Sequence, residues 1–155
     1  MALPATLLPR MKKAVSLEFS ELHEKVAIEL DGSRSLKTVM AIIGSLPIKV
    51  AINRWGDELY TDETPVRAEE ENARSVVSLF DVAYWPEGSA LCFFYGSTPI
   101  SKEDKIICYS PVNMIGRITS QKTYKNSCNQ LKKRMSTKKC RWCWASSRTW
   151  PSNPH

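Results

Sequence analysis

Two neighbouring segments near the start of the chain alternate between apolar and polar residues. In Ala14–Phe19 an apolar side chain recurs at every second position, and Val26–Leu30 repeats the pattern. A period of two places the apolar side chains on one face of a β-strand. Because a short connection separates the segments, we expect two half-buried strands that pair antiparallel.

The period then changes from two to that of a helix. Apolar residues between positions 36 and 43 fall at helical spacing, which predicts one α-helix within Ser35–Gly44. Ser33 or Ser35 is suited to cap its first turn. Gly44 is suited to end it.

The centre of the chain contains two runs that are apolar at nearly every residue. Leu79–Trp85 and Ala90–Tyr95 flank a turn of sequence Pro-Glu-Gly-Ser, and their aromatic and β-branched content predicts a hairpin. Apolar residues on both faces indicate strands that are covered on both sides, as in the wall of a barrel or sandwich. Residues 48–60 and 106–118 supply further strands, so the fold class is mainly β.

Length and charge bound the domain organisation. The chain has 155 residues and is 43% hydrophobic, enough for one domain with a full core. Residues 1–118 carry 13 Lys and Arg against 16 Asp and Glu, a net charge of −3, whereas residues 119–155 carry nine Lys and Arg and no acid. We expect residues 119–155 to be a disordered basic tail. The alternative is an arm that binds nucleic acid by phosphate neutralisation and Trp stacking.

Four ordered motifs carry a family resemblance. They are AINRWGDELY at Ala51–Tyr60, DVAYWPEG at Asp81–Gly88, LCFFYGSTP at Leu91–Pro99 and SPVNMIGRI at Ser110–Ile118. Together they resemble a small prokaryotic cyclophilin-like family. The resemblance implies a closed, roughly eight-stranded β-barrel with one or two short helices over its ends, built from residues 14–118 and preceded by a flexible extension at residues 1–13.

The sequence departs from the family pattern in two informative places. Phe80 stands where a glycine usually precedes the aspartate, here Asp81. After Ile118 the family normally has a segment rich in Glu, Lys and Gly and then a closing strand. This chain instead continues into the basic, acid-free residues 119–155.

Few residues offer catalytic chemistry. Arg54 falls near the position of the arginine that polarises the prolyl amide in true cyclophilins, but no Gln-Gly-Gly follows it. His23 and His155 supply neither a triad nor a metal cluster. The pair Cys140 and Cys143 has the spacing of a metal knuckle but lacks a second pair. We therefore predict no catalytic residue, no metal and no cofactor.

Aromatic residues with a few polar neighbours are typical of a ligand pocket. The predicted ligand-binding residues are Asn53, Arg54, Trp55, Glu58, Tyr84, Trp85, Phe93, Phe94, Thr98 and Asn113. Arg54 supplies a fork for a carboxylate or carbonyl, and Cys92 and Cys108 are interpreted as small buried hydrophobes. The predicted function is a binding module for a small molecule or peptide, and the alternative is a peptidyl-prolyl cis-trans isomerase.

The expected location is the cytoplasm, without contact to a membrane. No run approaches the length of about 20 apolar residues needed to span a bilayer. The first basic residues follow the apolar start of the chain, which is the reverse of a secretion signal.

Overall fold

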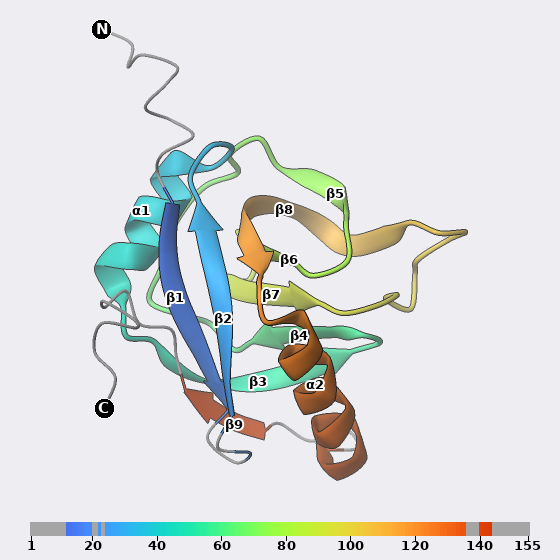
Figure 1. The fold of residues 1–155 in the computed structure, drawn as a ribbon. Helices are drawn as coiled ribbons and strands as arrows, with labels where there is room; N and C mark the ends of the chain where they lie inside the picture. Colours follow the sequence, from blue (N-terminus) through green and yellow to red (C-terminus); the bar gives the residue numbers. More distant parts are fainter. Residues whose placement is uncertain (1–11, 20–21, 23, 136–139, 144–155) are drawn as a thin grey trace, which may run out of the picture.

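The computed structural model describes residues 12–19, 22, 24–135 and 140–143, which form nine strands and two helices (Figure 1). The elements in chain order are β1 (Lys12–Phe19), β2 (Glu24–Asp31), α1 (Leu36–Ser45), β3 (Lys49–Trp55), β4 (Glu58–Thr61), β5 (Arg74–Val77), β6 (Asp81–Trp85), β7 (Ala90–Phe94), β8 (Ile106–Ile118), α2 (Gln121–Met135) and β9 (Cys140–Cys143). The mainly β fold and the helix predicted within Ser35–Gly44 are confirmed. Neither helix in this part of the chain is long and apolar enough to cross a membrane.

The strands form one strongly curled sheet, in the order β2-β1-β9-β3-β4-β7-β6-β8-β5. The β1–β2 hairpin lies beside the end of β8 (Figure 1), and β2 pairs with β8. Gly116 allows this approach, because a Cβ atom there would lie 2.2 Å from the Glu29 carbonyl oxygen. The close contact between two backbones explains why a glycine stands at this position of β8.

The expected closed barrel of residues 14–118 needs a correction. β1 and β3 are joined through β9, which pairs with β1 at one residue pair, Glu18 with Cys143, and with β3 at four. Residues 12–118 alone therefore form a curled half-barrel that is open between β1 and β3. The strand that spans this opening comes from the segment after residue 118, which the sequence analysis excluded from the fold.

The β6–β7 hairpin separates two apolar clusters. Val82, Tyr84 and Phe93 face the main core, whereas Ala83 and Cys92 face a second, smaller cluster. The alternation follows from the pleat of the strands. It confirms that both faces of the central hairpin are covered, and it places the second cluster under the N-terminal half of β8.

Helix α1 is capped by a residue distant in sequence rather than by Ser33 or Ser35. The Glu71 carboxylate accepts hydrogen bonds from the backbone N–H groups of Lys37 at 3.0 Å and Thr38 at 2.9 Å, and from the Thr38 hydroxyl at 2.8 Å. Ser35 makes no side-chain cap; its hydroxyl donates to the Glu71 carbonyl oxygen. The carboxylate thus satisfies the first free N–H groups of the helix.

These contacts lower the pKa of Glu71. Desolvation raises the pKa of the carboxyl, but the hydrogen bonds from Lys37 and Thr38 and the charge of Lys37 outweigh it. The stability that Glu71 contributes is therefore present above its ordinary pKa of 4.5 and is lost as the pH falls through the lowered value.

We expect Glu71→Ala to reduce the free energy of unfolding by about 1–2 kcal/mol at neutral pH, because it removes a charged cap. The matched control is Glu70→Ala, since Glu70 is an exposed neighbour whose loss should change stability by less than about 0.5 kcal/mol. Urea denaturation measures both. Equal losses in the two variants would contradict the capping role.

Helix α2 overturns the prediction that the whole of residues 119–155 is disordered. Its Tyr124, Cys128 and Leu131 side chains are fully buried in the main core. They follow one another at helical spacing, so α2 presents one apolar stripe to the sheet. Residues 1–11, 136–139 and 144–155 lie outside the described residues, and so do the expectations of flexibility or disorder that fall on them.

Phe80 explains how the chain tolerates the absence of the usual glycine. Its φ angle is +67°, in the left-handed region that favours glycine. The Phe80 ring contacts Tyr124 of α2 edge-on, with centroids 6.4 Å apart. The ring therefore gains packing against a helix at a position where a glycine would make no such contact.

Candidate functional site

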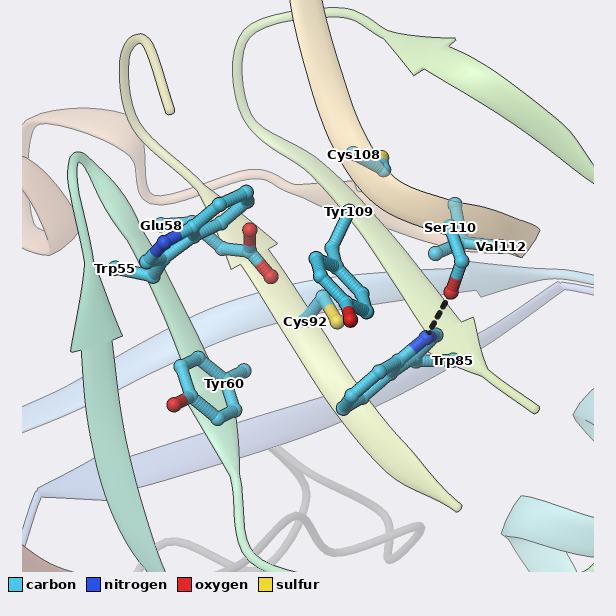
Figure 2. A pocket seen from close by; sticks show the side chains of 9 residues that line it. All are labelled: Trp55, Glu58, Tyr60, Trp85, Cys92, Cys108, Tyr109, Ser110 and Val112. Atoms are coloured by element: carbon cyan, nitrogen blue, oxygen red, sulfur yellow. Dashed lines mark hydrogen bonds between the residues drawn. The ribbon is translucent and has the colours of Figure 1, made fainter. Parts of the chain in front are cut away.

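A cavity of about 320 Å³ opens on the face of the sheet that carries the second cluster (Figure 2). It is lined by Trp55, Glu58, Tyr60, Trp85, Cys92, Cys108, Tyr109, Ser110 and Val112. These side chains come from β3, β4, β6, β7 and β8. Four of the nine are aromatic, and Glu58 is the only carboxyl among them.

The β3–β4 hairpin supplies three lining residues through its register. Trp55 pairs directly with Glu58, and paired residues project to the same face. Tyr60 lies two residues after Glu58 and shares that face. The turn requires Gly56, whose φ is +63° and where a Cβ atom would lie 2.7 Å from Pro99 Cδ.

The neighbouring strands continue the same face across the sheet. Tyr60 of β4 pairs with Cys92 of β7. Trp85 of β6 pairs with Ala90 of β7, next to the turn of the β6–β7 hairpin. The Trp85 indole N–H donates a hydrogen bond to the Ser110 hydroxyl of β8. This bond joins β6 to the part of β8 that covers the cavity.

The rings form a continuous series of edge-to-face contacts. Tyr109 contacts Trp55 with centroids 6.1 Å apart and Trp85 at 6.0 Å, and Trp85 contacts Tyr60 at 6.5 Å. Tyr109 lies between the two indoles (Figure 2) and is 69% exposed. An aromatic side chain this exposed, yet held by two others, forms an outer wall of the cavity.

Glu58 is buried among these rings, with 6% of its surface exposed. Desolvation raises its pKa from 4.5 to about 7, although a hydrogen bond with the Cys92 thiol acts in the opposite direction. The carboxyl therefore changes charge near neutral pH. A group of this kind in a cavity is a candidate for proton exchange or for binding a charged ligand.

The two cavity thiols are poor nucleophiles. Burial raises the pKa of Cys92 well above its ordinary value, and the nearby Glu58 charge raises it further. Burial and the same charge raise the pKa of Cys108 to about 12. Because the thiolate is the reactive form of cysteine, these residues contribute apolar, polarisable lining.

Three of the ten predicted site residues line the cavity, namely Trp55, Glu58 and Trp85. Tyr84 and Phe93 instead face the main core, where the Tyr84 hydroxyl donates to the Val66 carbonyl oxygen at 2.8 Å. Phe94 is fully buried in the second cluster without lining the cavity.

The predicted polar residues are engaged in structural hydrogen bonds. Asn53 donates to the Asp62 carboxylate at 3.0 Å, and Thr98 donates to the Ile107 carbonyl oxygen. Fully buried Asn113 donates to the Thr38 hydroxyl at 3.0 Å and accepts from the Glu71 N–H at 2.8 Å.

Arg54 is also absent from the cavity lining. It pairs with Leu59 on the opposite face of the hairpin, and its guanidinium donates to the Gly56 carbonyl oxygen at 3.1 Å. The structure thus separates Arg54 from Trp55 and Glu58, which the sequence analysis had grouped with it.

Six lining residues were absent from the prediction: Tyr60, Cys92, Cys108, Tyr109, Ser110 and Val112. Strand periodicity from Glu58 leads to Tyr60, and pairing of β4 with β7 leads from Tyr60 to Cys92. The β8 residues had no such signal, because they reach the cavity through the bend of a long strand. Within the described ranges, no group of three or more His, Cys, Asp or Glu side chains could hold a metal ion.

The fold and motifs define the class of protein. The Cyclophilin-like family matches residues 13–135, and this chain belongs to that family. The match extends beyond residue 118 and includes α2, in agreement with the packing of that helix.

Several solved structures resemble the chain. The solution structure of the hypothetical protein AF2241 from Archaeoglobus fulgidus is 38% identical, covers 88% of this chain and 95% of its own, and has a TM-score of 0.67. McbB in complex with tryptophan is 16% identical, covers 87% of this chain and 45% of its own, and has a TM-score of 0.70. The second likeness is one of fold. No protein with a curated description matches the sequence.

Proposed function

We propose that this protein binds a small organic molecule in the aromatic cavity, without chemistry on it. The observation that carries the proposal is the lining itself: four aromatic side chains and one buried carboxyl around about 320 Å³. Small-molecule sites are concave, mostly apolar and supplied with a few oriented polar groups. Glu58 and the Ser110 hydroxyl, which accepts a hydrogen bond from the Trp85 indole, supply polar groups here.

The alternative function is peptidyl-prolyl cis-trans isomerisation. It would rely on Arg54 to polarise the amide, and Arg54 lies on the face of the β3–β4 hairpin opposite Trp55 and Glu58. That placement favours binding over isomerisation. An isomerisation assay with proline peptides distinguishes the two functions.

We expect indole to bind in the cavity, and Tyr109→Ala to weaken its binding about five- to tenfold by removing one aromatic wall. Indole is a suitable probe because it is planar and apolar and because the structural neighbour McbB was solved with tryptophan. Tyr109 is 69% exposed, so its removal should leave the fold intact. NMR titration measures the affinity.

The control is Met40→Ala, which removes another exposed apolar side chain, 51% exposed, on helix α1. It should bind indole as the wild-type protein does. Equal affinity of Tyr109→Ala and wild type, or no saturable shift of any cavity resonance, would contradict the proposed function.

A further inference from the structure

The charge distribution of the cavity is one-sided. Glu58 is its only carboxyl, and no Lys, Arg or His side chain lines it. The ion pairs of the described side chains are Lys12 with Glu29 and Arg67 with Glu63, so none of them neutralises Glu58. An ionised carboxylate buried without a cationic partner is unfavourable, and a cation brought by a ligand would remove that cost.

The aromatic walls favour the same kind of ligand. Aromatic faces attract cations through the ring quadrupole, and Trp and Tyr do so more strongly when the site is desolvated. Tyr109 contacts both Trp55 and Trp85 at the cavity, and the Glu58 carboxyl points into the space beside these rings (Figure 2). Rings and carboxyl therefore converge on one volume.

The other titratable groups around Glu58 do not supply a competing charge. Cys92 of β7 and Cys108 of β8 are both held in the neutral thiol form by burial. Tyr60 of β4 and Tyr109 of β8 contribute phenol rings to the lining, and Tyr124 of α2 has its pKa raised well above the ordinary value. Outside the lining, Glu87 approaches the rim, 3.4 Å from the Ser110 hydroxyl.

We propose that the cavity selects ligands that carry an ammonium group, which is held between the indole and phenol rings and neutralised by Glu58. This inference rests on the proposed binding function and names its ligand class. Binding of an ammonium ligand to the protonated protein leaves an ion pair and releases one proton to solvent. A neutral ligand releases none.

The test compares tryptamine with tryptophol, which carries a hydroxyl in place of the ammonium group on the same indole ring. At about pH 7.5, where Glu58 is largely ionised, we expect tryptamine to bind at least about tenfold more tightly. The ratio of tryptamine affinity to tryptophol affinity should decrease at least about tenfold at pH 5.5, because Glu58 is then protonated and must lose its proton when tryptamine binds. Calorimetry near pH 6 in two buffers of different ionisation enthalpy should count about one proton released with tryptamine.

Glu58→Gln keeps the volume of the side chain and removes its charge, so the ratio of the two affinities should fall at least about fivefold, to the smaller preference that the aromatic rings supply alone. The matched control is Glu87→Gln, which removes a carboxylate at the rim and should retain the ratio.

The possible failures are distinguishable. Tryptophol binding without any preference for tryptamine, or a preference that is equally large in Glu58→Gln, overturns the inference and leaves the proposed function standing. If neither indole compound binds, the proposed function and this inference are both overturned.

Discussion

Between about pH 5 and pH 8, the free energy of unfolding should fall by about 2.5 kcal/mol more in the wild-type protein than in Glu58→Gln. The folded protein holds the Glu58 proton up to about pH 7, whereas the ordinary pKa is 4.5. A folded-state pKa that is raised gives stability that is fully present below pH 4.5 and lost as the pH rises through 7. Each pKa unit corresponds to about 1.4 kcal/mol, and Gln cannot ionise.

Urea denaturation at several pH values measures this difference. The pKa of Asp81 is also raised by desolvation, but Asp81 is common to both proteins and cancels in the comparison. Glu87→Gln serves as the control and should follow the wild-type profile, because Glu87 is exposed. Parallel profiles for wild type and Glu58→Gln would show that Glu58 is not protonated in the folded protein near neutral pH.

The largest loss of stability is expected for Tyr124→Ala, at about 3–5 kcal/mol. Tyr124 is fully buried and contacts the rings of Phe19, Phe80 and Tyr95. Its hydroxyl also donates to the Phe93 carbonyl oxygen at 3.1 Å. Truncation leaves a cavity at the centre of the main core and removes this hydrogen bond.

Lys125→Ala is the matched control, since Lys125 is the next residue of α2 and is exposed. Its effect should stay within about 0.5 kcal/mol. Urea denaturation of the full chain measures both variants. A disordered tail would make both substitutions neutral, so this pair tests the packing of α2 directly.

The local pattern predicted the fold where the period was clear. The alternating strands, the helix at Leu36–Ser45 and the central hairpin all follow from spacing of two or of 3.6 residues. Helix α2 was missed although Tyr124, Cys128 and Leu131 form an apolar stripe. The many charged and polar residues of α2 give it a low apolar content, which is typical of a disordered segment and conceals the apolar stripe.

The same pleat explains why only some of the predicted site residues line the cavity. Tyr84 and Trp85 are neighbours in sequence and therefore point to opposite faces of β6; so do Arg54 and Trp55 of β3. Trp55, Glu58 and Trp85 lie on the strand face that lines the cavity. Arg54 and Tyr84 lie on the opposite face. Tyr109 was beyond such reasoning, because only the tertiary bend of β8 brings it over the cavity.

The cap of α1 bears on the order in which the molecule forms. The helix has ten residues, no acid in its first turn and no side-chain cap from Ser35, and an isolated helix of this length is marginal in water. Its cap, Glu71, is 33 residues beyond Thr38 in the chain. The contact between Glu71 and the helix closes a loop that contains the β3–β4 hairpin and the segment before β5. Closing such a long loop costs entropy and slows folding. We therefore expect helix α1 to become stable only after the sheet has formed, rather than to nucleate the sheet.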